Sequence, residues 1–423
     1  MRKGFVLAAA LLALSALCVT SGIAQSASSG PVELRFTVWT GNAAHLEMLN
    51  AIAAKYTATH PKVTVKFDTI PYDDYAQKLA IELAGSNPPD AGWITERDAT
   101  AFISAHTLLD LSRALVPYNY ADFSKSATAL WERGGAVYGV PFSNSPVVVF
   151  YNQTLFEKAG IPTPADLVAK GQWTWEAFAS IAKQIKAKTG TYGYQTMDGT
   201  GYTDNLWETI VPMIRAYGGD IWDAKGACTL DAPEAVKAMT LFHDMIYVDK
   251  SVVPPGDQSD FFAGSAAMTL NQISRVSKLA TASFKWGIAV LPKGPAGEAQ
   301  VIGQAAIVAF KAGKHSAEAM DFVAFMTNKE NVATMTKFFP PARVSVLDSD
   351  TFAKGNPAIP PAMMKSVVGY ALKNGRILPS DANFPKIDLV ARSGFDQLWQ
   401  QNADVKAALS GIASSIAPLI TKP

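Results

Sequence analysis

Apolar and polar residues alternate over residues 32–39, a pattern that predicts a β-strand at the start of the folded chain. The period then becomes helical over residues 45–59, with one apolar stripe formed by Leu46, Leu49, Ile52, Ala53 and Tyr56. Further strands are predicted at 63–67 and 91–94, with a helix at Tyr72–Ala84 between them. This repeated strand–helix–strand order favours a parallel sheet with right-handed crossovers.

The second half of the chain has longer helical patterns, at 174–188, 203–217, 232–248 and 317–327. Strands are predicted at 266–270, 286–291 and 301–310, and the last run is long enough to cross between two domains. A chain of 423 residues is too long for one ordinary hydrophobic core, so we expect two domains.

The segment 136–152 is the most informative part of the sequence. Tyr138-Gly139 predicts a turn, and Pro141 and Pro146 enclose a stiff polar elbow of Phe-Ser-Asn-Ser. The unbroken apolar run 147–151 predicts a strand buried on both faces. Small polar groups fixed just before a buried strand indicate a hinge that also lines a cleft.

Charge and cysteine content narrow the possible partners. The formal net charge is only +1 and no basic run or basic–aromatic stripe occurs, which argues against a nucleic-acid partner. At the N-terminus, Arg2-Lys3 precedes an apolar run at 5–19 and a small-residue exit, as in a secretory signal peptide cut after Ala24. A membrane anchor and a lipid attached to Cys18 are the alternatives for this leader. After the leader, Cys228 is the only cysteine in the sequence, so we expect no internal disulfide.

No familiar catalytic motif is present. The sequence has no nucleophile elbow, paired-histidine zinc helix, phosphate-binding Gly-Lys loop or dinucleotide fingerprint. We therefore expect no cofactor, no metal site and no enzymatic activity. A glycosidase needs no local motif for its two carboxylates, so an exported carbohydrate-active hydrolase is the main alternative. Ligands of parallel sheets bind beyond the carboxyl ends of the strands, which makes residues 40–42 and 95–97 the first binding candidates.

Six short phrases occur in an order typical of one protein family, at residues 39–42, 87–93, 138–141 with 151–152, 174–178, 261–268 and 286–295. In these phrases the sequence resembles family 1 of the extracellular solute-binding proteins, the maltose-binding-protein-like receptors of bacterial sugar importers. The resemblance covers nearly the whole chain after the leader.

The resemblance implies an α/β fold of the two-lobed periplasmic-binding-protein type, with parallel-rich sheets and three interdomain crossings. The N-terminal lobe would comprise 32–143 and 306–341, and the C-terminal lobe 147–301 and 345–423. The crossings would lie near 142–146, 302–306 and 340–345. Such a receptor is a periplasmic monomer that closes on a sugar or sugar derivative and delivers it to the ABC importer permease subunits in the inner membrane. A receptor for a non-sugar solute, such as a glycerophosphodiester or a polyamine, stays open as an alternative.

Carried over position by position, the resemblance implies a ligand site formed by both lobes and the crossings. The candidates are Asn42, His45, Trp93, Thr95, Glu96, Asn144, Ser145, Trp207, Glu208, Asn271, Gln272, Gly303, Gln304 and Arg343. Trp93 is the candidate for stacking on a sugar ring and Glu96 for accepting its hydroxyls, although Glu96 could instead pair with Arg97 on the surface. If the Arg343 side chain reaches the cleft, its positive charge favours an anionic sugar as the ligand. Near Ser145 the maltose-binding-type receptors have an acidic residue, and at the position of Ser274 they have a stacking aromatic. This chain has serine in both places, so the identity of the sugar stays open.

Overall fold

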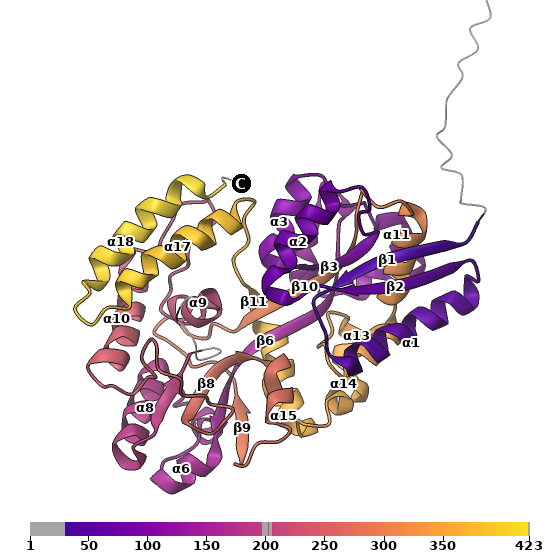
Figure 1. The fold of residues 1–423 in the computed structure, drawn as a ribbon. Coiled ribbons are helices and arrows are strands. Elements are labelled where there is room, and N and C mark those ends of the chain that lie inside the picture. The colour runs from indigo at the N-terminus through magenta and orange to yellow at the C-terminus, as the bar shows by residue number, and fades with distance from the viewer. Residues whose placement is uncertain (1–29, 197–201, 203–204, 422–423) are drawn as a thin grey trace, which may run out of the picture.

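The structure is a computed structural model that describes residues 30–196, 202 and 205–421. The predicted leader, residues 1–24, lies outside the described residues. Figure 1 shows two lobes side by side, with the indigo segments in one and the magenta and yellow segments in the other. Strands β6 and β10 run between the lobes. The predicted two-lobed α/β fold is confirmed.

One sheet of nine strands runs through both lobes in the order β2-β1-β3-β10-β6-β8-β7, with β11 beside β10 and β9 beside β6. The strands are β1 (Val32–Val38), β2 (Val63–Thr69), β3 (Ala91–Thr95), β6 (Val140–Asn152), β7 (Tyr192–Gln195), β8 (Ala266–Gln272), β9 (Trp286–Ala289), β10 (Val301–Ala309) and β11 (Arg376–Ile377). A separate ribbon pairs β4 (Glu132–Arg133) with β5 (Ala136–Val137). β1 is parallel to β2 and β3, whereas β6 and β10 pair antiparallel where the lobes meet.

Helices cover both faces of this sheet. In the first lobe these are α1 (Ala43–Thr59), α2 (Tyr72–Ala84), α3 (Glu96–Ser104), α4 (Ser112–Leu115), α5 (Lys125–Thr128), α11 (Ser316–Met326), α12 (Lys329–Met335) and α13 (Val344–Leu347). The others are α6 (Gln153–Ala159), α7 (Pro164–Ala169), α8 (Trp175–Thr189), α9 (Leu206–Ala216), α10 (Pro233–Tyr247), α14 (Asp350–Gly355), α15 (Pro361–Met363), α16 (Tyr370–Asn374), α17 (Phe384–Leu398) and α18 (Val405–Ile416), with the 3₁₀ helix η4 (Ile273–Leu279).

Strand β6 differs from its prediction in one respect. The sequence predicts a polar elbow followed by a strand, but the structure has a single strand from Val140 to Asn152. The register with β10 shifts where Ala305 pairs with Ser143 and Ala306 pairs with Pro141, which leaves Phe142 as an extra residue and accommodates Pro141. From Ser143 to Ser145 the elbow residues follow the two-residue alternation of a strand, in which neighbours point to opposite faces.

Each lobe buries apolar side chains on both faces of its part of the sheet. In the first lobe, Ile307 of β10 packs in the core under α1 and α11, and Val308 packs in the core under α2 and α3. In the second lobe, Val149 of β6 faces the core of α8, α9 and α10, whereas Phe150 faces the core of segment 352–372. The two-faced burial predicted for 147–151 is confirmed. Two separate sets of cores fit two lobes, and the predicted boundaries stay a proposal; Val346 packs in the core of the first lobe, although the prediction assigns 345–423 to the second.

A buried carboxylate fixes the loop that leads into β3. Asp90 Oδ2 accepts a hydrogen bond from the Arg35 amide at 3.0 Å, and Oδ1 accepts one from the His315 amide at 2.9 Å. The Asp90 amide donates to Arg35 O at 2.9 Å, and Asp90 O accepts from the Phe310 amide at 2.9 Å. Asp90 thus joins β1 to the segment that precedes α11.

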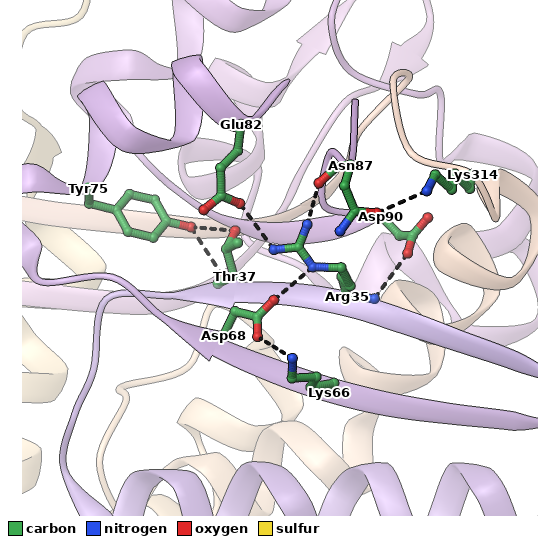
Figure 2. Close-up of polar contacts among 9 residues, drawn as sticks. All are labelled: Arg35, Thr37, Lys66, Asp68, Tyr75, Glu82, Asn87, Asp90 and Lys314. Carbon is green, nitrogen blue, oxygen red and sulfur yellow. Dashed lines mark hydrogen bonds and ion pairs between the residues drawn. The ribbon is translucent and has the colours of Figure 1, made fainter. Parts of the chain in front are cut away.

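The Arg35 side chain joins β1 to β2 and α2 (Figure 2). Its Nε lies 2.9 Å from Asp68 Oδ2, and its Nη2 lies 3.3 Å from Glu82 Oε2. On the same side of the strand, the Tyr75 hydroxyl of α2 donates to Thr37 O at 3.1 Å. These contacts fix α2 against β1, and the segments that follow β1, β2 and β3 are positioned by them.

Replacing Asp90 by alanine should lower the free energy of unfolding by about 2–4 kcal/mol, because two amides lose their acceptor and each buried unsatisfied group costs about 1–3 kcal/mol. Asp90→Asn keeps one acceptor oxygen and should cost roughly half as much. Asp74→Ala removes an exposed carboxylate of α2 and should change stability by less than about 0.5 kcal/mol. Urea unfolding followed by circular dichroism measures all three variants. Equal midpoints for Asp90→Ala and Asp74→Ala would contradict this role of Asp90.

Candidate functional site: a cleft between the lobes

A cavity of about 550 Å³ lies between the two lobes, beside the paired strands β6 and β10. We call it the cleft. Its lining residues come from the first lobe (Trp39, Thr40, Gly41, Asn42, His45, Tyr72, Trp93, Thr95, Glu96, Arg97 and Phe339), from the crossing strands (Phe142, Ser143, Ser145, Gly303, Gln304 and Ala305) and from the second lobe (Asn205, Gln272, Ser274 and Arg275). The segments after the carboxyl ends of β1 and β3 both reach it, as expected for an α/β sheet.

Aromatic side chains form one wall of the cleft. Trp39 follows β1 and is half-buried, and its ring lies edge-on to Tyr72, which is 46% exposed, with 5.8 Å between centroids. Trp93 of β3 has an exposed fraction of 0%. It stacks on Phe142 at 4.8 Å and makes an edge contact with Trp39 at 4.9 Å. The accessible aromatic surface therefore belongs to Trp39 and Tyr72, and Trp93 supports Trp39 from the core.

The N-terminus of α1 contributes two polar side chains. Asn42 caps the helix, because its Oδ1 accepts a hydrogen bond from the His45 amide at 3.3 Å. The His45 ring has Nδ1 2.9 Å from Thr40 Oγ1 and packs against Phe339. Burial lowers the pKa of His45, so the ring is neutral at neutral pH. A ligand in the cleft can therefore use Asn42 Nδ2 as a donor and His45 Nε2 in its neutral form.

Three ionisable side chains, those of Glu96, Arg97 and Glu208, lie close together where α3 of the first lobe faces α9 of the second. Arg97 Nη1 lies 3.9 Å from Glu208 Oε1, and Arg97 Nη2 donates to the Tyr72 hydroxyl at 2.6 Å. Glu208 is 1% exposed, and its Oε2 has no hydrogen-bond partner among the described residues. Arg97 thus pairs across the two lobes with Glu208, and not with Glu96 on the surface.

Glu96 is buried at the start of α3, and its Oε2 accepts a hydrogen bond from the backbone amide of Gln304 at 2.8 Å. Burial raises the pKa of Glu96 to about 7, and the charge of Glu208 adds to the rise, while Arg97 and the Gln304 amide act against it. A large share of Glu96 is therefore protonated at neutral pH. In that form the carboxyl group both donates and accepts hydrogen bonds in the cleft.

The crossing strands and the second lobe add amide and hydroxyl groups. A Cβ atom at Gly303 would lie 2.6 Å from Gln272 Nε2, so the bare backbone there makes room for the Gln272 amide. Ser145 Oγ accepts a hydrogen bond from the Ser274 amide at 3.3 Å. Small residues on β6 and β10 therefore let polar groups of the second lobe reach the cleft.

The cleft continues into a second cavity of about 720 Å³, and the two share Tyr72, Thr95, Arg97, Asn205 and Arg275. The second cavity adds the charged side chains of Asp98, Lys278, Asp388 and Arg392. Together the two cavities form a groove along the lobe boundary that has room for an extended ligand.

Five of the predicted site residues do not line the cleft: Asn144, Trp207, Glu208, Asn271 and Arg343. Trp207 is in the core of the second lobe and donates its Nε1 hydrogen to Asp388 at 2.5 Å. Asn271 is fully buried in β8. Asn144 points away because Ser143 and Ser145 face the cleft, and a strand places the residue between them on the other side.

Arg343 does not reach the cleft and is 1% exposed. Its Nε donates to Thr327 O at 2.9 Å and its Nη2 donates to Tyr118 O at 2.7 Å. Its Nη1 donates to Asn119 O at 3.1 Å and pairs with Asp122 at 3.3 Å. Every nitrogen of the guanidinium group is used inside the first lobe, so the contact expected between Arg343 and an anionic sugar has no place in this structure.

Sequence reasoning missed several cleft residues, among them Tyr72, whose exposed fraction is 46%. Tyr72 begins α2, three residues after β2 ends at Thr69. The signal for Tyr72 is its place beyond the carboxyl end of β2, where parallel sheets bind ligands. Phe339 carries no such local signal, because it lies beside Trp93 at the cleft only in the folded protein.

The described residues contain no group of three or more His, Cys, Asp or Glu placed to hold a metal ion. Within that part of the chain, no helix is long and apolar enough to cross a membrane. Cys228 is a free, half-buried thiol.

Comparison with known proteins identifies the family. Residues 43–333 match the family described as bacterial extracellular solute-binding protein. The arabinooligosaccharide-binding protein of Bacillus subtilis is 25% identical over 349 residues, which cover 78% of this chain and 77% of that protein.

Two solved structures show the same fold. The ABC substrate-binding protein of Listeria monocytogenes in complex with cycloalternan matches with a TM-score of 0.79 at 23% identity, over 92% of this chain and 99% of that one. UgpB from Mycobacterium tuberculosis in complex with glycerophosphocholine matches with a TM-score of 0.77 at 22% identity, over 92% of this chain and 98% of that one. Because the family match spans well over half of its residues, this chain belongs to the bacterial extracellular solute-binding proteins.

Proposed function

We propose that this protein is the substrate-binding protein of an ABC-type carbohydrate importer, which captures a sugar or sugar derivative in the cleft and delivers it to a membrane permease. The cleft itself carries the proposal. It combines the faces of Trp39 and Tyr72 with amide, hydroxyl and carboxyl groups from both lobes. A sugar has the complementary chemistry, with an apolar face of C–H groups and a rim of hydroxyls that each accept and donate hydrogen bonds.

Binding by both lobes explains capture. A ligand that contacts the first lobe at Trp39 and the second at Gln272 binds the closed arrangement better than an open one, and so shifts the equilibrium toward closure. Closure buries the ligand's hydroxyls, and each one left without a partner costs about 1–3 kcal/mol. The protein therefore selects those sugars whose hydroxyls all find hydrogen-bond partners in the closed cleft.

We propose that the protein turns nothing over. A glycosidase needs two carboxyl groups that flank the scissile bond. Glu96 is the one carboxyl group among the described residues that line the cleft, because Glu208 is buried behind Arg97, and Asp98 and Asp388 line only the second cavity. We further propose a periplasmic monomer that docks on the permease subunits when its ligand is bound, a location that family membership supports.

A thermal-shift screen tests the ligand class. An arabinooligosaccharide, lactose or maltotriose at 100 times its dissociation constant should stabilise the protein by about 2.7 kcal/mol, because it binds only the folded form. Glycerophosphocholine is the second candidate, since Arg97 and Arg275 both line the cleft and a phosphate group would favour them. A shift with glycerophosphocholine and with none of the sugars would contradict the sugar proposal. New reducing ends after incubation with the bound oligosaccharide would contradict the absence of turnover.

Trp39→Ala should weaken binding of the ligand found in that screen by at least about tenfold, because the loss of an aromatic face removes both buried area and a stacking contact. Trp93→Ala should instead lower the free energy of unfolding by about 3–5 kcal/mol, as expected for a buried tryptophan. Trp222→Ala is the control, since that half-buried side chain lines neither cavity. Calorimetry and urea unfolding separate the two effects; undiminished affinity in Trp39→Ala would rule out its role.

Glu96 should make the ligand-free protein less stable as the pH rises from about 4.5 to about 7.5. Its pKa is raised to about 7 in the folded protein, so the folded state holds a proton that the unfolded state releases above pH 4.5. The loss amounts to roughly 3 kcal/mol, at about 1.4 kcal/mol per pKa unit. Glu96→Gln keeps the acceptor for the Gln304 amide and should flatten this part of the pH profile. Parallel profiles for wild type and Glu96→Gln in urea unfolding would show that Glu96 is not the cause.

A further inference from the structure

A buried carboxylate of the second lobe has its counter-charge in the first lobe. Glu208 lies in the first turn of α9, which packs into the core of the second lobe, and its exposed fraction is 1%. Its Oε1 lies 3.9 Å from Arg97 Nη1 of α3. Among the described residues its Oε2 has no hydrogen-bond partner, so Arg97 is the one polar partner that the carboxylate has there. Helices α3 and α9 belong to different lobes (Figure 1).

The two members of this ion pair depend on it to different degrees. Arg97 also donates to the Tyr72 hydroxyl of its own lobe at 2.6 Å, and 15% of its side chain is exposed. In its own lobe Glu208 has the positive end of α9, which favours a carboxylate in the first turn but less strongly than a buried ion pair does. Moving Arg97 away would leave Glu208 as a buried charge without a counter-charge, which is costly inside a protein.

Helix α3 contacts the second lobe at a second point. Thr100 Oγ1 lies 2.9 Å from Ser380 Oγ. Ser380 belongs to the second lobe, because Leu378 before it and Phe384 after it are in the core of that lobe. A movement of α3 away from the second lobe would break this contact together with the ion pair. Water replaces the partner of a hydroxyl at little cost, whereas a buried charge is harder to satisfy, so the ion pair is the contact that opposes opening.

We propose that Glu208 is a positioning residue for lobe closure: its pairing with Arg97 favours the closed arrangement in the ligand-free protein. A receptor whose binding-competent arrangement is more populated binds its ligand more tightly. Glu208 therefore strengthens ligand binding although it does not line the cleft. This effect on affinity rests on the proposed function, whereas the effect on the lobes does not.

Double electron–electron resonance on the ligand-free full chain tests the proposal without any sugar. The spin labels are attached at Gln77→Cys on α2 and Ser393→Cys on α17, with Cys18 and Cys228 replaced by serine. Both labelled side chains are exposed, and their helices line the second cavity from opposite lobes, so the distance between the labels reports opening.

The labelled protein should have a short-distance population, and Glu208→Gln should lower it by at least about threefold, because the amide keeps the shape of the side chain and removes its charge. Glu234→Gln makes the same change at an exposed site of α10 and should leave the distance distribution unchanged. Equal distributions in the protein with Glu208 and in Glu208→Gln would overturn the proposal.

Ionic strength provides a second test, which stands even if Glu208→Gln fails to fold. Raising it from about 0.01 M to about 1 M shortens the Debye length from about 30 Å to about 3 Å, which stabilises separated charges more than paired ones. The short-distance population should therefore fall with salt in the protein that keeps Glu208, and should change much less in Glu208→Gln. A distribution that salt does not change would also overturn the proposal.

Calorimetry extends the test to binding. Glu208→Gln should bind the arabinooligosaccharide, lactose or maltotriose that stabilises the wild type with at least about threefold lower affinity, whereas Glu234→Gln should bind it like the wild type. Equal affinity in Glu208→Gln and the wild type would contradict the role of Glu208 in binding. If none of these sugars binds but the distance distribution responds to Glu208→Gln and to salt, the proposed function fails and the role of Glu208 in closure is supported.

Discussion

The antiparallel pairing of β6 with β10 is the constraint on which the rest of this structure depends. Each strand runs from one hydrophobic core into the other, so neither lobe can move without bending both strands. The pair also separates the cleft from a smaller cavity of about 160 Å³. Side-chain alternation places Ser143 and Ser145 at the cleft and Asn144 on the side of the smaller cavity. The same thirteen-residue strand therefore supplies the interlobe connection, part of the ligand site and the wall behind it.

Buried charge is arranged around the cleft so that the lobes are coupled without a large electrostatic penalty. Arg97 carries the only described ion pair of the cleft wall that joins the two lobes, to Glu208, and it is held in place by the Tyr72 hydroxyl. Glu96 is buried beside them and avoids a third buried charge by holding its proton near neutral pH. Glu96 lines the cleft and can exchange hydrogen bonds with a ligand hydroxyl, whereas Glu208 lies behind Arg97 and does not line the cleft.

Most of the fold could be predicted from the sequence because apolar periodicity reports burial directly. The helix predicted at Tyr72–Ala84 is α2 itself, and the run 301–310 differs from β10 by a single residue at its end. Asn42 and Glu96 follow strand ends and line the cleft, as the rule for parallel sheets predicts. The misplaced residues needed information that no local pattern holds. Trp93 is enclosed by Phe142 and Phe339, and the carbonyls that occupy Arg343 lie more than 200 residues earlier, at Tyr118 and Asn119. The resemblance places Asn144 in the cleft, and the two prolines around it predict a loop, in which the strand alternation that turns Asn144 away would not apply.

The central claim is that two lobes joined by bendable strands close on a ligand held by both. Small-angle X-ray scattering of the protein with and without a saturating oligosaccharide that raises its melting temperature tests it most directly. The account predicts a smaller radius of gyration and a shorter maximum dimension in the bound state. Identical scattering profiles for the free protein and the saturated complex would contradict it.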